Sequence, residues 1–399
     1  MNKKDLKLMF FLAYKNIVKS KSTFLVIVAV MAMSFLSITF FSAIIDGLSY
    51  EFEDSMIKGQ TGHLMIEPSS EESFIFNSNR LEKNIFKIPG VVGVASRLES
   101  NILITFKNEE LGAPVFFIDP VDELKVSNFH ESIIEGSFLS YKDTDEIIVG
   151  ADLLEQYAPK DDTKKRFNLR VGDHVNLTFN NGYTKEYKIK GIFKTGSKFS
   201  DDKILINKKE YFSIFKKENI SHKILIKLPS RGLEKEYIQK IKALGVTEQI
   251  NPWETKIGMI KQFIGSLQIT NQITGFIGLL TAFATIYIII FINVTNKRKQ
   301  IGILKAIGIK KIIILGSYIM QSFMYGFIGV ILGNIIMQIL LALFVSHPLA
   351  MPIGDVVPLL TTTKLLTTSL ILILASIIAG FFPSRKAAND NILDAIFGG

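Results

Sequence analysis

The chain has 399 residues, of which 48% are hydrophobic and 21% charged, and its formal net charge is +9. This combination excludes an ordinary soluble domain and a wholly embedded membrane protein, and predicts apolar residues gathered in a few blocks with the charges elsewhere. The sequence has no cysteine, which excludes disulfides, thiolate metal sites and cysteine nucleophiles.

Four blocks of the sequence are apolar over the thickness of a bilayer. A helix over residues 22–45 is roughly 36 Å long, against about 30 Å of hydrocarbon. This block is too long for the apolar region of a cleaved signal peptide, so we expect it to remain as an anchor. The sequence predicts four transmembrane helices at residues 22–45, 268–296, 312–346 and 365–384.

Basic residues indicate the orientation of these helices. Residues 1–21 carry six lysines against Asp5, and residues 297–311 carry six basic side chains and no acid. The positive-inside rule therefore places the amphipathic segment 1–21, the loop 297–311 and the tail 385–399 in the cytoplasm. Residues 46–261 and the loop 347–364 are then extracytoplasmic, in a multi-pass protein of the cytoplasmic (inner) membrane. Because the excess basic charge lies beside the membrane, nucleic acid is not an expected partner.

Residues 46–261 have the pattern of a folded α+β domain. Short runs rich in Ile, Val, Phe and Thr predict strands at 101–106, 114–118, 146–149, 175–179, 186–193 and 223–227. Asn180-Asn181-Gly182 predicts a hairpin turn, because Asn and Gly accept a positive φ. Helices are predicted at 80–87, 152–157, 208–217 and 233–244, and a charged loop at 159–166. The predicted fold class is a membrane α-helical protein with four transmembrane helices and a large extracytoplasmic α+β domain inserted between helices 1 and 2.

Motifs of catalysis are missing from the sequence. It has no G-x-x-x-x-G-K-[ST] phosphate loop and no H-E-x-x-H, and no predicted span has an ionisable residue at its middle. We therefore expect no catalytic residue, no metal site and no cofactor in this chain, which is not predicted to be an enzyme. The energy for any transport must come from another protein.

The loop after the second predicted span carries the most informative motif. Its apolar positions lie near helical spacing and Gly308 follows them, which predicts a short amphipathic helix that ends at this glycine. Such a helix either lies on the lipid surface, anchored by its lysines, or docks into a groove of a cytoplasmic protein. Charge alone favours the lipid surface. The residues concerned are Lys299, Gln300, Ile301, Gly302, Ile303, Leu304, Lys305, Ala306, Ile307 and Gly308.

This loop resembles the one between spans two and three of the MacB/FtsX-like (type VII) ABC transporter permeases, with their R-x-E-I-G-x-L-[KR]-A-[IL]-G pattern. Residues 12–17 and 383–396 are similar to the first cytoplasmic helix and the tail of that family. Gln300 replaces the usual acid and Asn391 a common proline. Within the family, residues 62–66, 88–94, 149–154, 170–173 and 191–196, with Trp253, resemble the lipoprotein-release (LolC/LolE-like) permeases.

The resemblance implies a mechanism. The permease would pair with a second permease chain, identical or related, and bind a dimer of a cytoplasmic ABC ATPase, which holds ATP–Mg. The loop helix would pass the ATPase motion to the outer domain, a MacB-like periplasmic core, which moves substrate outside the membrane (mechanotransmission). Alternatives are a MacB-like efflux permease and an FtsX-like scaffold that activates an extracytoplasmic hydrolase.

A lipoprotein or other amphiphilic cargo would place its acyl chains between the outer ends of spans one and two, in contact with membrane lipids. The same apolar residues also suit lipid-facing or helix-packing positions. The candidates are Phe35, Phe40, Phe41, Ile44, Ile264 and Leu267. The chain turns directly between residues 181 and 190, so capture of a soluble carrier by a longer loop there is not expected.

Span three carries a face of small residues, Gly326, Gly329 and Gly333, at spacings suited to close helix contact. Span four of the same chain and a dimer interface are equally good partners for this face.

Overall fold

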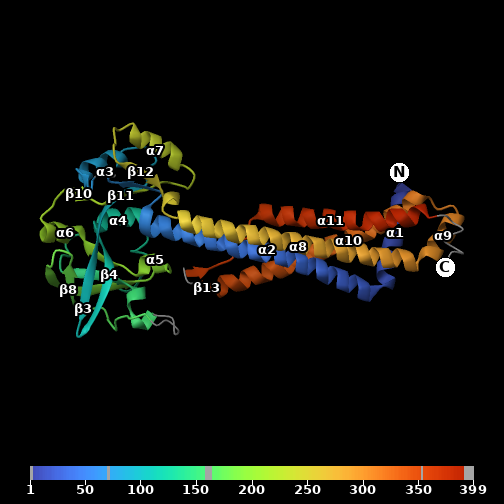
Figure 1. The fold of residues 1–399 in the computed structure, drawn as a ribbon, viewed down its shortest axis with the longest axis horizontal. Helices are drawn as coiled ribbons and strands as arrows, with labels where there is room; N and C mark the ends of the chain where they lie inside the picture. Colours follow the sequence, from blue (N-terminus) through green and yellow to red (C-terminus); the bar gives the residue numbers. More distant parts are fainter. Residues whose placement is uncertain (1–2, 70–71, 158–163, 352–353, 391–399) are drawn as a thin grey trace. The chain divides into compact units, whose positions relative to one another are not determined.

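The computed structural model describes residues 3–69, 72–157, 164–351 and 354–390. The chain divides into two compact units (Figure 1). The helical unit comprises residues 1–49, 262–349 and 356–399, and the inserted domain comprises residues 50–261 with 350–355.

Four helices are long and apolar enough to cross a membrane. They are α2 (Lys21–Ser55), α8 (Gly258–Asn296), α10 (Lys311–Ser346) and α11 (Thr362–Asn389). Each contains one of the predicted spans, so the predicted class of four apolar helices with an inserted α+β domain is confirmed. Two of these helices are longer than the predicted spans. Helix α2 extends to Ser55, and α11 continues through Pro383 to Asn389. Strands β13 (Leu349–Met351) and β14 (Gly354–Val356) lie between α10 and α11 in the sequence.

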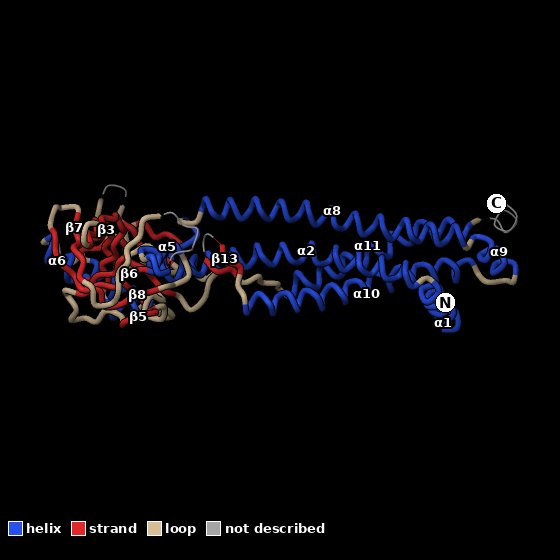
Figure 2. Tube along the Cα trace, turned by 90° about the horizontal axis from the view of Figure 1, so that it is seen from below, coloured by secondary structure: helices blue, strands red, loops and turns tan. Residues whose placement is uncertain are grey.

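Small residues on α10 allow close packing within the bundle. A side chain at Gly326 would meet Ser376 of α11, whereas side chains at Gly329 and Gly333 would meet Met31 and Phe35 of α2. The small face of span three is therefore used inside the chain, against α11, which was one of the two partners left open, and also against α2. Figure 2 shows α2, α10 and α11 running alongside one another.

Helix α1 (Lys3–Lys19) packs on the first turns of α10. Its buried residues Met9, Ala13 and Ile17 follow the spacing of one helical face, and Met9 lies against Gly316. Lys15 and Lys19 are exposed, and so are apolar residues such as Phe11 and Tyr14.

A ten-stranded mixed sheet forms the centre of the inserted domain, in the order β12-β1-β11-β3-β4-β9-β6-β8-β5, with β7 paired to β3 and β8. The strands are β1 (Leu64–Glu67), β3 (Gly93–Phe106), β4 (Glu109–Ile118), β5 (Ile133–Gly136), β6 (Glu146–Gly150), β7 (His174–Phe179), β8 (Thr184–Phe193), β9 (Ile204–Asn207), β11 (Lys223–Lys227) and β12 (Gln249–Pro252). All six predicted strands are confirmed. A second small sheet pairs β2 (Ile75–Phe76) with β10 (Ile220–Ser221).

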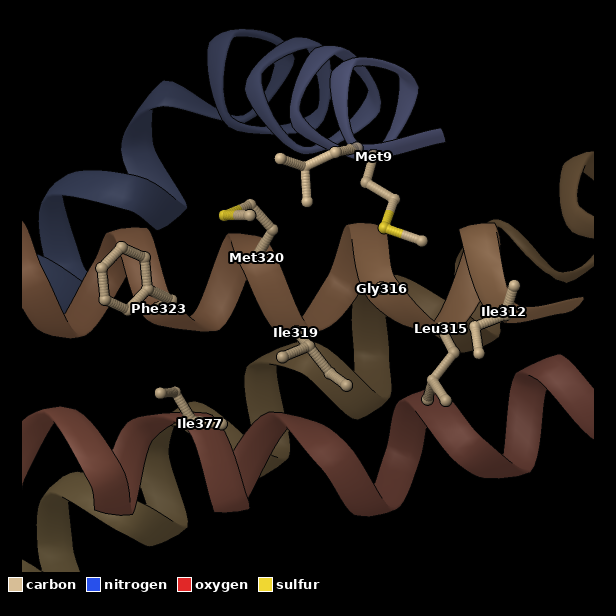
Figure 3. A pocket seen from close by; sticks show the side chains of 9 residues that line it. Met9, Ile312, Leu315, Gly316, Ile319, Met320, Phe323 and Ile377 are labelled. Carbon is tan, nitrogen blue, oxygen red and sulfur yellow. The ribbon is translucent and has the colours of Figure 1, made fainter. Parts of the chain in front are cut away.

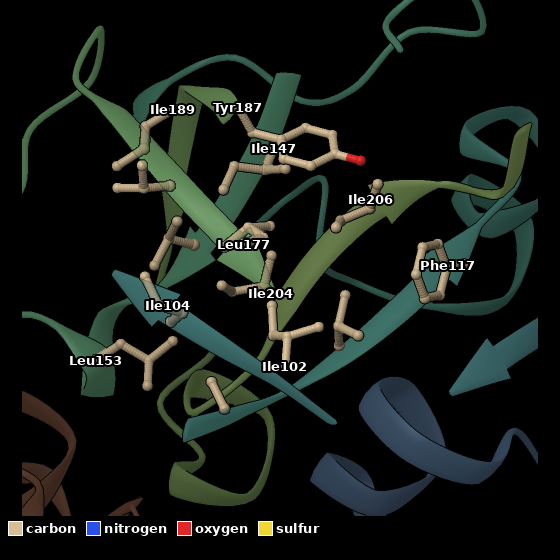
Figure 4. Close-up of a cluster of buried hydrophobic side chains, with 14 of the residues drawn as sticks. Ile102, Ile104, Phe117, Ile147, Leu153, Leu177, Tyr187, Ile189, Ile204 and Ile206 are labelled. Atoms are coloured by element: carbon tan, nitrogen blue, oxygen red, sulfur yellow. The ribbon is translucent and has the colours of Figure 1, made fainter. Parts of the chain in front are cut away.

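Alternating side chains of these strands build the core (Figure 4). Ile102 and Ile104 of β3 meet Leu177 of β7 and Ile204 of β9 on one face, and all four are buried. On the other face Phe116, Ile148 and Leu205 form a second cluster. Strands β6 and β9 are apolar at consecutive positions because the middle of the sheet is covered on both faces.

The hairpin between β7 and β8 confirms the turn predicted at residues 180–182. Gly182 has a φ of 79° and donates its N–H to the carbonyl of Phe179 at 2.9 Å, and Phe179 donates to Tyr183 at 2.9 Å. Gly182 alone uses a positive φ here, while the side chain of Asn181 accepts the Tyr183 N–H at 3.1 Å.

Three of the four predicted helices of the domain are present, as α3 (Ser78–Phe86), α6 (Lys208–Phe215) and α7 (Glu234–Lys242). The helix predicted at 152–157 is wrong. Two 3₁₀ turns, Ala151–Leu153 and Glu155–Tyr157, flank Leu154, which is extended, buried and bridged to Phe167. Helices α4 (Pro120–Val126) and α5 (Lys198–Asp201) complete the domain, and residues 158–163 of the predicted charged loop lie outside the described residues.

Candidate functional site

The loop between α8 and α10 contains the helix that the sequence predicts, α9 (Arg298–Ala306). It ends in a left-handed residue, Gly308, with a φ of 91°. The N–H of Gly308 donates to the carbonyl of Lys305 at 3.0 Å, and that of Ile309 donates to Leu304 at 3.1 Å. These two bonds form a Schellman motif, and Leu304 and Ile309 both pack, partly buried, against the core of the bundle. The predicted helix stop at Gly308 is confirmed.

The two faces of α9 have different surroundings. Ile301 is 3% exposed and packs into the core of the bundle, whereas Ile303 is 49% and Ile307 72% exposed. Ala306 is exposed beside them, and so are the polar residues Lys299 and Gln300. The apolar residues available to a partner are therefore Ile303, Ala306 and Ile307. Among the predicted docking residues, Ile301, Gly302 and Lys305 are buried against the chain itself.

Lys305 attaches α9 to the end of α11. Its ammonium donates to the carbonyls of Ala387, at 3.1 Å, and Asp390, at 2.7 Å. The last carbonyls of a helix lack partners within it, and a cation there is favourable. Burial, together with the neighbouring Lys311 charge, lowers the pKa of Lys305. A second bond joins Arg298 Nε to Asp390 Oδ2 at 3.0 Å. The tail motif at 391–396 lies outside the described residues.

Lys297, directly before α9, attaches this segment to α1. Its Nζ donates to Asn16 Oδ1 at 2.8 Å. Helix α9 is thus held at its start to α1 and α11 and near its end to α11, so it moves only together with the bundle or by breaking these bonds.

The six predicted cargo residues differ in how exposed they are. Phe35 is buried against Gly333 and Ile264 is 6% exposed, so neither is open to a cargo. Phe41 is 54% exposed, and Phe40 is half-buried with its ring 5.8 Å from that of Phe344. Ile44 and Leu267 are also half-buried. Phe40, Phe41 and Ile44 remain as a group of accessible apolar residues on one stretch of α2.

An apolar groove lies at the other end of α10 (Figure 3). It encloses about 490 Å³ between α1, α10 and α11 and opens where Leu6 and Ile312 are exposed. Phe344, which contacts Phe40, is near the last turn of α10, so this groove is distinct from the predicted cargo region. Its lining residues are Leu6, Met9, Ile312, Leu315, Gly316, Ile319, Met320, Phe323 and Ile377.

Sequence reasoning missed the π-helix that follows α2 at Met56–Thr61. Inside the inserted domain, the buried guanidinium of Arg97 donates to the carbonyl of Gly59 in this element at 2.7 Å and pairs with the buried carboxylate of Glu123. The rings of Phe116 and Phe129 lie 5.1 and 5.4 Å from the guanidinium. Arg97 therefore fastens the π-helix to β3 and α4.

A second arginine fastens the last turns of α2 within the same domain. Arg231 donates to Glu53 at 3.1 Å and to Asp54 at 3.2 Å, and its guanidinium lies 4.9 Å from the ring of Tyr50 and 6.0 Å from that of Trp253. Phe52, Ile57, Trp253 and Ile257 form a small apolar core beside it. The Trp253 position drew attention in the sequence, but no pattern indicated its arginine partner.

Four apolar helices, an inserted α+β domain and a short anchored helix between the second and third spans define a multi-pass membrane protein. Residues 273–392 match the family described as FtsX-like permease C-terminal. Residues 273–392 therefore carry an FtsX-like permease domain, and the relatives of the chain described below are ABC transporter permeases.

The relatives are similar over most of their length. The chain is 22% identical to an uncharacterized ABC transporter permease, MJ1507, of Methanocaldococcus jannaschii, covering 97% of this chain and 96% of the relative. It is 24% identical to the lipoprotein-releasing system transmembrane protein LolC of Buchnera aphidicola, covering 75% and 73%. It is also 24% identical to the ABC transporter permease YtrF of Bacillus subtilis, covering 85% of each chain.

Among solved structures, the periplasmic region of MacB from Actinobacillus actinomycetemcomitans matches with a TM-score of 0.37 and 11% identity. That match covers 53% of this chain and 98% of the MacB region. The extracellular domain of YknZ from Gram-positive bacteria matches with a TM-score of 0.33 and 13% identity, covering 47% and 97%.

Proposed function

We propose that this permease converts ATP hydrolysis by a separate cytoplasmic ATPase dimer into movement of its inserted domain outside the membrane. The cargo is a lipoprotein or another amphiphile taken from the outer leaflet of the cytoplasmic membrane. The observation that carries the proposal is α9, which has one face bonded to the bundle and an exposed apolar face at Ile303 and Ile307.

The bonds of α9 explain how a push on its exposed face would travel. A partner that presses on Ile303 and Ile307 displaces α9, and Lys305 and Lys297 pull the ends of α11 and α1 with it. A lipid-surface helix needs an exposed apolar face as well, but it does not need the buried Lys305 bonded to α11 or the half-buried Lys297 bonded to α1. The geometry therefore favours docking over the lipid-surface interpretation.

The fastening of α2 within the inserted domain supports the second half of the proposal. Arg97 of β3 bonds the π-helix to the sheet, and Arg231, in the loop between β11 and α7, bonds the last turns of α2 to the same domain. A helix bonded in this way moves the sheet rather than bending away from it. The permease would act with a second copy or a related chain, with both termini in the cytoplasm.

Two observations support the cargo assignment. Phe41, with Phe40 and Ile44 beside it, presents apolar surface that an acyl chain could contact. The relative LolC is named for a lipoprotein-releasing system. Phe35 and Ile264 are no longer part of this proposal because both are buried.

Docking is tested with Ile303→Asp and Ile307→Asp in the full chain, co-expressed with its ABC ATPase. Both side chains are exposed, so a carboxylate there leaves the fold intact but opposes burial in a partner. Val18→Asp, at an exposed apolar position of α1, is the matched control. We expect both α9 variants to lose co-purification of the ATPase and the control to retain it. ATPase recovery equal to wild type in both α9 variants would exclude docking through this face.

The cargo is tested separately with a photo-crosslinking residue at position 41 in membranes that contain lipoproteins. The same residue at position 35, which is buried, provides the control. Crosslinks from position 41 to lipoprotein acyl chains support the proposed cargo. Crosslinks to phospholipid alone contradict it without affecting the docking result.

A further inference from the structure

A small polar pocket lies between α1, α9 and the start of α10, and it shares no lining residue with the apolar groove. The pocket has a volume of about 170 Å³ and is less open to solvent than the groove. Three of its lining residues are lysines and none is acidic. The lining residues are Leu12, Lys15, Asn16, Lys19, Lys297, Gln300, Ile301, Leu304, Ile314, Ser317 and Tyr318.

No acidic side chain among the described residues lines this pocket. In the described part of the helical unit the acidic side chains are Asp5, Asp46 and Asp390, and none of them lines the pocket. Asp46 pairs with Lys364, and Asp390 with Arg298. Three ammonium groups around one small cleft repel one another, and the repulsion is strongest where water is excluded.

Lys297 experiences this repulsion most directly. Its side chain is half-buried, and burial, with the nearby charge of Lys19, lowers its pKa. An anion between the ammonium groups would reverse both effects, because an opposite charge stabilises the charged form of each lysine.

The other polar groups of the pocket suit an anion with several oxygens. Asn16 accepts the hydrogen bond from Lys297 on its Oδ1, which leaves its amide N–H groups as donors. The amide of Gln300 and the hydroxyl of Tyr318 add donors to the same lining. A tetrahedral phosphoryl group carries one negative charge and two free oxygens in a lipid diester, and more of both as free phosphate. Its oxygens point to several sides, so it matches this set better than a planar carboxylate. The volume is below the range of about 300–1,000 Å³ for larger ligands, which excludes a whole nucleotide.

We propose that this pocket binds a phosphoryl group, that of an anionic lipid headgroup or of free phosphate, between Lys15, Lys19 and Lys297. The bound group bridges α1 to the segment that begins α9, alongside the direct Lys297–Asn16 bond. Binding itself does not depend on the proposed function. Any effect of the anion on ATPase coupling does.

The test uses the full chain with two probes. Inorganic phosphate is titrated into lipid-free micelles of the protein by calorimetry. In the other arm, phosphatidylglycerol retained from mixed phosphatidylcholine vesicles is counted by native mass spectrometry. The variants are Lys19→Gln and Lys297→Gln, and Lys310→Gln, an exposed lysine outside the pocket, is the control.

Each pocket variant is expected to weaken binding about tenfold, the loss that follows from one charge-assisted hydrogen bond, while the control binds like wild type. Binding in the phosphate arm assigns free phosphate, and retention of phosphatidylglycerol without phosphate binding assigns a lipid headgroup. Lys19→Gln keeps the Lys297–Asn16 bond, so its result does not depend on the position of α9. Equal binding by Lys19→Gln and wild type, or no binding of either probe, would overturn the proposal.

Discussion

Replacement of Arg97 by methionine removes a buried guanidinium and keeps most of its volume. Glu123 then holds a carboxylate with no exposed surface and no cation beside it, and the carbonyl of Gly59 loses its donor. Removal of one partner from a buried ion pair costs about 3–5 kcal/mol. The packing against Phe116 and Phe129 is retained in part by the methionine, so the loss is mainly electrostatic.

The single tryptophan of the chain provides a local readout. Trp253 lies in the inserted domain, 6% exposed, with its indole N–H donating to Glu234 at 3.3 Å. Urea unfolding of the full chain in micelles, followed by Trp253 emission, therefore reports the stability of this domain. A loss of 3–5 kcal/mol shifts the midpoint down by about 1–2 M urea.

Two further variants distinguish the loss of the ion pair from a nonspecific loss of stability. Arg97→Met combined with Glu123→Leu removes both charges and should recover most of the stability, because no unpaired charge remains buried. Arg231→Met, whose ion pairs are about 30% exposed on each side, should cost about 1 kcal/mol or less. The reasoning is refuted if Arg97→Met shifts the midpoint no further than Arg231→Met, or if the double variant is no more stable than the single one.

Three other predictions concern local features. Gly308→Val forces a β-branched residue into a φ of 91°, at a cost of about 1–2 kcal/mol. Amide hydrogen exchange in α9 should therefore accelerate, and unchanged exchange would contradict the role of Gly308 in ending the helix. Gly333→Val places a side chain 2.9 Å from the ring of Phe35 and should lower thermal stability by about 1–3 kcal/mol, whereas Gly265→Val, with open space around it, should not. His63 and His222 accept backbone N–H groups on Nδ1, and burial lowers the pKa of each below its ordinary value of 6.5. The unfolded state therefore binds more protons in acid, so the Trp253 midpoint should fall as the pH drops from about 7 to about 5 and should fall less in His63→Asn/His222→Asn.

Features governed by local composition were predicted well. The four spans follow from long apolar blocks, and six strands follow from runs of β-branched and aromatic residues. Gly182 and Gly308 were assigned to turns because glycine alone adopts their backbone conformation without strain. In each case the cause lies within a few residues of the effect.

Features that depend on distant partners were not predictable. Ile301 and Ile303 are equally apolar in sequence, and only the packing of α9 on the rest of the bundle decides which is buried. Lys305 resembles the other basic residues of its loop but bonds to carbonyls more than eighty residues away. Phe35 looked accessible because nothing near it in the sequence identifies Gly333 as its neighbour. No sequence pattern indicated that Arg97 and Glu123 form a buried pair.

The edge of the sheet has a consequence for biosynthesis. Strand β1 pairs with β11 and β12, so Met65 has its neighbours at Leu225 and Asn251. The first strand of the domain is therefore unpaired until nearly the whole insertion has been synthesised. Such non-local closure is slow and leaves a strand edge exposed meanwhile. Folding of this permease should be most vulnerable to proteases and most dependent on chaperones in the interval between the emergence of residue 64 and that of residue 252.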